Sequence, residues 1–430
     1  MSAGICIMNK QAIAMAADSA VTVGYHAAIH NSANKLFSLS KVAPVGLIIY
    51  SNANLMSVPV EIIVKEYKKQ LKDKTFHTLQ EYVDDFIKYI ELNAELFRLN
   101  LNEKGYVTDI FANLMNGLLG DYKNLLDKKC ECEKRPLTDT EFDNIRNQAI
   151  EYTIHFIDSI PKRSDYSYAK YVEGKYIDYF VELLTNDDSF KWILDDQVKK
   201  LTEKACEIFD TDFNRNGYVG IALAGYGDSE IYPHMIHIRV SGFINGKLRY
   251  QIVETAEIQE SNLASIVPLA QTDVMQTFLF GINDRFLSDL SNELPSQIKS
   301  SIDSIDDNMF APGKKEEVRA QISTVTESVV KHVAEVAGKD YMLPIIQSVA
   351  TLPIEELALL AESMINITSL RRKVALDRNI GTVGGPIDVA IISKGDGFIW
   401  LKRKHYFERK YNPQYFYSHF DKKERGDDDE

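Results

Sequence analysis

The sequence has 430 residues, of which 45% are hydrophobic and 26% are charged, a composition typical of a globular protein with a sizeable core. The 49 Lys and Arg residues against 62 Asp and Glu residues give a net charge of −13, which argues against nucleic acid or an anionic membrane as a partner, because both require basic surfaces. Four cysteines are too few for a disulfide framework, and the start of the chain does not resemble a signal peptide. We therefore expect a cytoplasmic protein.

Short apolar runs dominate the first hundred residues. Residues 3–8 and 12–17 flank the polar segment Asn-Lys-Gln and predict a β-hairpin, and residues 45–50 are apolar throughout, as in a strand buried on both faces. Helical spacing of apolar residues follows, beginning near Pro59 and again near Leu79. The expected order is three strands and then two helices.

The rest of the chain alternates between helical and strand-like regions. Residues 101–215 show helical spacing and no convincing strand, with a polar segment at 128–136 that predicts a loop. Helical patterns return at 263–290, 314–337 and 353–372. Strands are expected at 218–226, 235–241, 247–254, 386–393 and 397–403, where turn residues separate apolar runs.

This order of elements predicts an α+β fold built in layers. We expect one discontinuous core domain formed by residues 1–100 and 216–410. A helical insertion at 101–215 and a smaller helical insertion at 295–340 interrupt it, and residues 418–430 form an acidic tail.

The N-terminus carries a candidate for chemistry. Removal of Met1 leaves the Ser2 hydroxyl beside a free α-amine, whose ordinary pKa of about 7.7–8.0 allows it to act as a general base near neutral pH. Asp18 ends the strand antiparallel to the one that Ser2 begins, so a tight hairpin brings the two residues side by side. Asp18 and Lys35 are candidates for setting the pKa of that amine; the alternative is an ordinary start and a structural ion pair.

The pattern that begins with Ser2 and continues as AIAMAADSAVT (12–22), NKLFSL (34–39) and VGLIIYSNA (45–53) resembles the N-terminal nucleophile hydrolases of the proteasome β-subunit, HslV and Anbu type. In that family the mature chain begins with a nucleophilic Thr, or occasionally Ser or Cys. An Asp follows sixteen residues later, which is the spacing between Ser2 and Asp18 (18 − 2 = 16). Lys35 lies one residue later than the family's Lys. The resemblance covers roughly residues 2–72 and 217–407.

The resemblance implies a four-layer αββα sandwich and a specific role for each matching residue. Ser2 would be the nucleophile and its amine the base. Lys35 would lower the pKa of both groups through its positive charge, and Asp18 would hold Lys35 in place.

Other site residues match the family pattern less closely. The oxyanion hole would lie at Ser51 and Asn52, through backbone N–H groups. Thr382 or Val383 stands where the family has a supporting Ser, and Asp377 is nearest to the position of its supporting Asp, at a different spacing.

The implied activity is hydrolysis of peptide bonds by a threonine-type peptidase that here carries Ser as its nucleophile, without a metal or another cofactor. The implied partners are peptides or unfolded proteins as substrates, further copies of the chain in a homo-oligomer, and a separate ATP-dependent unfoldase, since the sequence contains no ATP-binding loop. The alternatives are a catalytically silent, proteasome-like scaffold subunit and an amidase acting on a small molecule.

Overall fold

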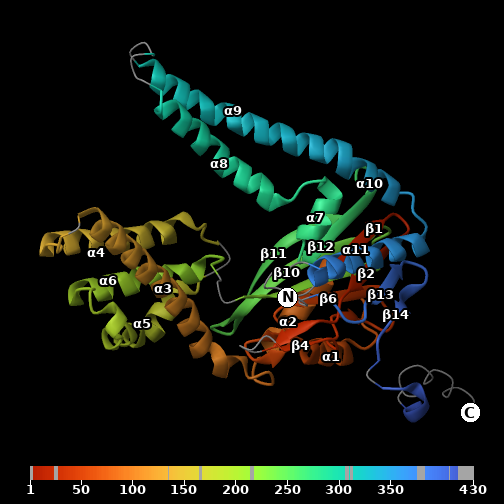
Figure 1. Cartoon of the computed structure of the whole chain (residues 1–430). Helices are drawn as coiled ribbons and strands as arrows, with labels where there is room; N and C mark the ends of the chain where they lie inside the picture. The colour runs from red at the N-terminus through yellow and green to blue at the C-terminus, as the bar shows by residue number, and fades with distance from the viewer. Residues whose placement is uncertain are drawn as a thin grey trace, which may run out of the picture.

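The computed structural model describes residues 3–23, 28–133, 135–163, 167–213, 217–305, 309, 313–374, 383–405 and 407–414. It is an α+β structure with two five-stranded antiparallel sheets and two small hairpins (Figure 1). None of the helices within these ranges combines the length and the hydropathy that crossing a bilayer requires.

The first sheet contains the N-terminal hairpin. The predicted hairpin is confirmed, because β1 and β2 pair antiparallel with Gly4 opposite Ala17. Both predicted C-terminal strands are also present, and β13 pairs with β2. In spatial order the strands are β12 (Ala264–Ala270), β1 (Ala3–Asn9), β2 (Ala12–Ala17), β13 (Asp388–Ser393) and β14 (Gly397–Lys402).

Strand β12 corrects one prediction. Residues 263–290 are not helical throughout, because 264–270 form a strand that pairs with β1 and places Ala270 opposite Ala3. Pro268 weakens the strand pattern, since proline is excluded from the interior of a sheet. It is accommodated here because β12 is an edge strand. Helix α7 (Asp273–Phe280) follows it.

The second sheet joins early and central strands of the chain. The predicted strands at 45–50, 218–226, 235–241 and 247–254 all form. In spatial order the strands are β11 (Lys247–Glu257), β10 (His234–Ile244), β9 (Val219–Gly225), β6 (Val45–Ser51) and β5 (Leu36–Ser38). The small hairpins are β3 (Val21–Val23) with β4 (Ala28–His30) and β7 (Asn54–Leu55) with β8 (Val58–Pro59).

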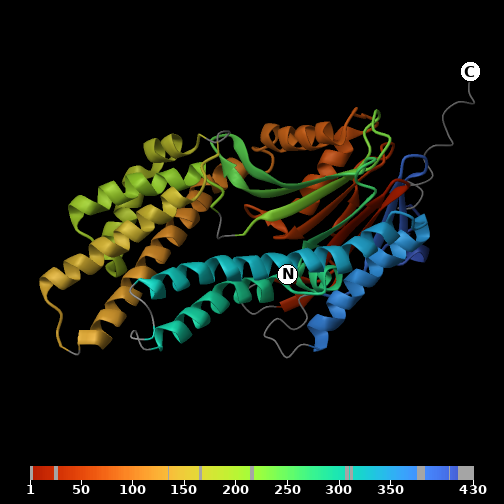
Figure 2. The same cartoon turned by 90° about the horizontal axis from the view of Figure 1, so that it is seen from above.

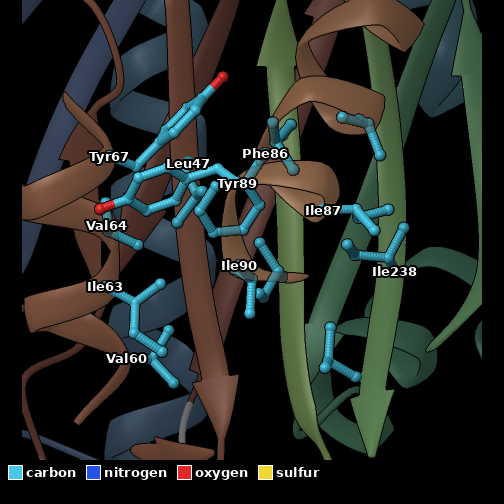
Figure 3. Close-up of a cluster of buried hydrophobic side chains, with 14 of the residues drawn as sticks. Leu47, Val60, Ile63, Val64, Tyr67, Phe86, Ile87, Tyr89, Ile90 and Ile238 are labelled. Atoms are coloured by element: carbon cyan, nitrogen blue, oxygen red, sulfur yellow. The ribbon is translucent and has the colours of Figure 1, made fainter. Parts of the chain in front are cut away.

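Helices α1 (Val60–Leu71) and α2 (Leu79–Leu92) pack against one face of the second sheet. Figure 3 shows their apolar side chains directed at β6 and β10, where Leu47 and Ile238 lie. Ile48 and Tyr50, on the other face of β6, share a buried cluster with residues of β1 and β2. The opposite face of the first sheet packs against α10 (Leu343–Val349) and α11 (Ile354–Val374).

The segment after α2 is helical, as expected, and has a hydrophobic cluster that also includes Ile244 of β10. Its helices are α3 (Leu99–Glu133), α4 (Asp139–Ser159), α5 (Ala169–Asn186) and α6 (Asp195–Cys206), with 3-10 turns at Asp188–Phe190 and Glu207–Asp210. The loop predicted at 128–136 is wrong in its first part, because α3 continues to Glu133. An ion pair of 2.8 Å between Lys129 and Glu133, one turn apart, supports this last turn.

Helices α8 (Asp284–Asp303) and α9 (Lys314–Val336) form an arm that projects from the sheets (Figures 1 and 2). The arm begins at Asp284, earlier than the boundary expected at 295, so Pro295 lies inside α8. A π-helical turn (Ala337–Met342) links α9 to α10, and a 3-10 turn lies at Arg409–Tyr411. The expected acidic tail at 418–430 lies outside the described residues.

Candidate active site at the N-terminal edge of the first sheet

Asp18 is the centre of the candidate site. It follows β2 directly and is fully buried. Its Oδ1 atom accepts the N–H of Ala3 at 2.9 Å, and its Oδ2 atom accepts the N–H groups of Ala20 at 3.2 Å and Gly384 at 3.0 Å. The carboxylate therefore ties together the start of β1, the end of β2 and the segment before β13.

Lys35 points its ammonium group into this carboxylate. The Nζ atom lies 2.5 Å from Asp18 Oδ1 and 2.6 Å from the carbonyl oxygen of Ala20, and the residue is 4% exposed. An ammonium has three N–H donors, so these two contacts leave one donor for a further acceptor. Desolvation by burial lowers the pKa of Lys35; Asp18 opposes this shift, and the positive charge of Lys404 adds to it.

The predicted nucleophile, Ser2, and Met1 lie outside the described residues. The structure does fix the residue that follows them. Ala3 donates to Asp18 through its N–H and accepts the N–H of Asp18 at 3.1 Å through its carbonyl oxygen. The chain thus enters β1 directly beside the buried Asp18–Lys35 ion pair.

The two residues predicted to form the oxyanion hole lie at the end of β6. Ser51 has a left-handed backbone with φ of 67°, and both residues are exposed. The backbone N–H of Asn52, however, donates to the carbonyl oxygen of Tyr218 at 3.1 Å. Because this N–H is already hydrogen-bonded, it is not available to an oxyanion. The structure therefore gives no support to the Asn52 N–H as a donor of the oxyanion hole.

The supporting residues expected at Thr382 and Asp377 also lie outside the described residues. The neighbouring segment packs against the site, because Ser19 donates its backbone N–H to Gly384 O at 3.1 Å and its hydroxyl to Pro386 O at 2.5 Å. The Gly-Gly segment before β13 is therefore bound to the residue that follows Asp18.

A second buried ion pair was not singled out from the sequence. Asp388, the first residue of β13, is opposite Ala17 and accepts from both the backbone N–H and the Nζ of Lys404. Asp388 is 2% exposed. No motif marks this pair, since Asp388 and Lys404 are brought together by the pairing of β13 with β14.

A cavity of about 410 Å³ lies beside the end of β6. Its walls come from the loop after β6, from β9 and β10, and from the first turns of α3 in the helical insertion; they include Asn52, Met56, Asn102, Tyr106, Tyr218 and Ser241. The contribution of α3 could not be read from the sequence, because it depends on how α3 packs against β10. The cavity therefore adjoins the exposed turn at the end of β6.

In the described part of the chain, no group of three or more His, Cys, Asp or Glu side chains is placed to hold a metal ion. His234 and His237, which stand close in sequence, have separate environments. His234 pairs with Glu230 at 3.0 Å, whereas the His237 ring contacts the Tyr50 hydroxyl.

No known family model matches the sequence, and no curated protein matches it. Solved structures with detectable similarity include a Gly-1 mutant of Anbu from Hyphomicrobium sp. strain MC1, which is 8% identical over 97% of this chain and 94% of that chain, with a TM-score of 0.27. Anbu from Yersinia bercovieri, described as an ancestral β-subunit, is 10% identical over 97% of this chain and 96% of that chain, with a TM-score of 0.26. Values this low carry no argument about activity.

Proposed function

We propose that this protein is a proteasome-like N-terminal nucleophile hydrolase that cleaves peptide bonds with Ser2 after removal of Met1. The observation that carries the proposal is the buried pair of Asp18 and Lys35, which is bonded to the backbone of Ala3. A buried ion pair placed beside a chain terminus is well suited to setting the protonation of a terminal amine.

The proposed reaction proceeds in two steps. The α-amine of Ser2 takes the hydroxyl proton while the oxygen bonds to the substrate carbonyl carbon; the C–N bond then breaks, and the leaving amine takes the proton from the ammonium. The resulting ester is hydrolysed by water, which gives its proton to the same amine, and the Ser2 oxygen leaves with that proton. The positive charge of Lys35 favours the unprotonated amine and stabilises the developing alkoxide.

The proposed oxyanion donor is the backbone at Ser51, since the N–H of Asn52 is engaged by Tyr218. Thr382 and Asp377 remain proposed supporting residues. The fold proposed with this activity is a four-layer αββα sandwich made by residues 1–100 and 216–410. Its two helical insertions would then be 101–215 and the arm that includes 295–340.

The partners proposed with this activity are peptides or unfolded proteins, further copies of the chain, and a separate ATP-dependent unfoldase. The cavity beside Asn52, with a volume of about 410 Å³, is of the size that binds a peptide side chain and its neighbours.

The decisive experiment combines mass spectrometry of the N-terminus with labelling by an uncharged β-lactone probe. We expect Met1 to be absent, and we expect a probe adduct on Ser2 that disappears in Ser2→Ala. Ser19→Ala is the matched control, because Ser19 is a buried serine of the same region and its variant should retain the adduct on Ser2. A retained Met1, an acetylated Ser2, or a free Ser2 that takes no label would refute the proposal in favour of the silent scaffold.

A further inference from the structure

A second cavity, of about 120 Å³, adjoins the larger one and shares Tyr218 and Ser241 with it. Strands β10 and β11 supply most of its walls. Two of its lining residues, Arg239 and Arg249, carry guanidinium groups, and Asp212 carries a carboxylate. The carboxylate of Asp212 is already in an ion pair with Arg163, at 3.3 Å. The side chains around this cavity therefore leave it with excess positive charge.

Arg239 is the residue of this cavity that is placed to bind an anion. Its guanidinium lies over the ring of Tyr218, 4.6 Å from the ring centre, and the side chain stands opposite Gln251 in the register of β10 and β11. Within the described residues, no acidic side chain forms an ion pair with Arg239. The Arg239 side chain also hydrogen-bonds with Tyr50. A guanidinium has five N–H donors, so others remain to bind a carboxylate.

Arg249 forms the fixed wall of the same cavity. It is 1% exposed, and it donates to the carbonyl oxygens of Thr211 and Phe213 and to the hydroxyl of Tyr106, the last at 3.1 Å. These three acceptors are neutral oxygens, and together they fix the orientation of the guanidinium. Arg249 therefore adds a rigid positive field to the site where Arg239 is available for direct contact.

The cavity is connected to the proposed oxyanion loop by Tyr218. The carbonyl oxygen of Tyr218 accepts the Asn52 N–H, and its neighbour Val219 is opposite Ser51 in the register of β6 and β9. A substrate bound along this edge would pass from the loop at the end of β6 to the ring of Tyr218 and then to Arg239.

We infer that Arg239 makes this cavity a subsite for a carboxylate, so that the protein selects peptides with an acidic side chain near the scissile bond. The inference rests on the proposed hydrolase function. Two sources of carboxylate fit the same chemistry, the side chain of Asp or Glu and the free C-terminus of a peptide. The test below distinguishes them.

The test uses pairs of coumarin-amide peptides that differ only by Glu against Gln at each of four positions before the scissile bond. A hydrogen bond to a charged group is stronger than one to a neutral group by about 1–1.5 kcal/mol, so we expect kcat/KM to favour Glu by about 5- to 10-fold at one position. The ratio should fall towards one in Arg239→Gln and reverse in Arg239→Glu. Because each ratio is internal to one variant, partial loss of folded protein cancels.

The matched control is Arg285→Gln, since Arg285 lies on the arm, has 90% of its side chain exposed and is 3.9 Å from Asp289. This variant should keep the wild-type ratio. A wild-type enzyme that prefers Gln at every position, or an Arg239→Glu variant that still prefers Glu, would overturn the inference while leaving the hydrolase function intact.

A binding experiment separates failure of the inference from failure of the proposed function. The Ser2→Ala variant is titrated by calorimetry with C-terminally amidated Glu and Gln peptides and with the Gln peptide bearing a free C-terminus. Tighter binding of the amidated Glu peptide that is lost in Ser2→Ala/Arg239→Gln supports a side-chain subsite even if no cleavage occurs. Tighter binding of only the free C-terminus assigns the carboxylate to the chain end. Equal binding of all three peptides refutes the subsite.

Discussion

Replacement of Lys35 by Met tests whether the ion pair beside the N-terminus is a determinant of folding as well as of the proposed chemistry. Met has a similar length and no charge, so the substitution removes the ammonium and leaves Asp18 in a fully buried position. The carboxylate then loses its contact at 2.5 Å with Lys35 Nζ.

The size of the expected loss of stability depends on the hydrogen bonds that Asp18 keeps after the substitution. Removing one partner of a buried ion pair costs about 3–5 kcal/mol, because the other charge stays desolvated. Three backbone N–H groups, from Ala3, Ala20 and Gly384, still donate to the carboxylate and offset part of this cost. We therefore expect the free energy of unfolding to fall by an amount at the lower end, about 3 kcal/mol, in Lys35→Met.

The assay is urea unfolding followed by far-UV circular dichroism, with the slope of the transition compared between variants. The control is Lys402→Met, because Lys402 forms an ion pair of 2.6 Å with Glu362 but has 58% of its side chain exposed. An exposed pair is worth about 1 kcal/mol or less, so the control should change stability little. Equal effects of the two substitutions would refute the view that burial makes the Asp18–Lys35 pair important.

Three further predictions concern buried groups near the site. Burial, reinforced by Arg239, lowers the pKa of His237 from 6.5 to about 4, so as the pH falls the unfolded chain takes up a proton before the folded chain does. The free energy of unfolding should therefore decline between pH 6.5 and 4, by about 3 kcal/mol at most, and His237→Gln should flatten this decline in urea titrations at each pH. In Gly220→Ala the new Cβ would lie 2.2 Å from the Tyr50 ring, and such overpacking should cost about 1–3 kcal/mol in the same assay; an unchanged midpoint would contradict the close approach. Glu103→Gln removes a carboxylate near the start of α3 that accepts four hydrogen bonds. Limited proteolysis of the segment α3–α6 should therefore become faster. An unchanged rate would contradict a role of Glu103 in holding this segment in place.

The parts of the fold that the sequence predicts well are those in which the pattern of apolar residues is local. The β1–β2 hairpin and the helices α1 and α2 follow from runs and periodicities of a few residues, and the structure buries the expected side chains. The edge strand β12 was missed because its evidence is not local. Pro268 argues against a strand until the pairing with β1 shows that only one of its edges is hydrogen-bonded.

Charged residues explain a second difference between the sequence prediction and the structure. The segment from 128 to 133 is polar enough to predict a loop, yet it forms the end of α3. The polar residues support the helix because Lys129 contacts Glu133 one turn later and also reaches Glu141 at 3.3 Å at the start of α4. The contact with Glu141 depends on how two helices meet, which periodicity alone does not contain.

The candidate site also has features that the sequence predicts and one that only the structure reveals. The proximity of Asp18 to the chain start follows from a hairpin of fixed register, and Lys35 follows from a family pattern in sequence. The engagement of the Asn52 N–H by Tyr218 depends on the pairing of β6 with β9, which are separated by more than the whole helical insertion. A residue type can be matched from sequence, whereas the availability of its N–H requires the tertiary structure.

The helical segment α3–α6 is locked to the second sheet where the larger cavity lies. The ring of Tyr106 on α3 packs onto the backbone of Gly242, where an added Cβ would come within 2.3 Å of it. Arg249 donates to the same Tyr106 at 3.1 Å, and Glu103 accepts the backbone N–H of Asn245 at 2.8 Å. These contacts fix α3 against β10 and β11, so α3 supplies a rigid wall to the cavity.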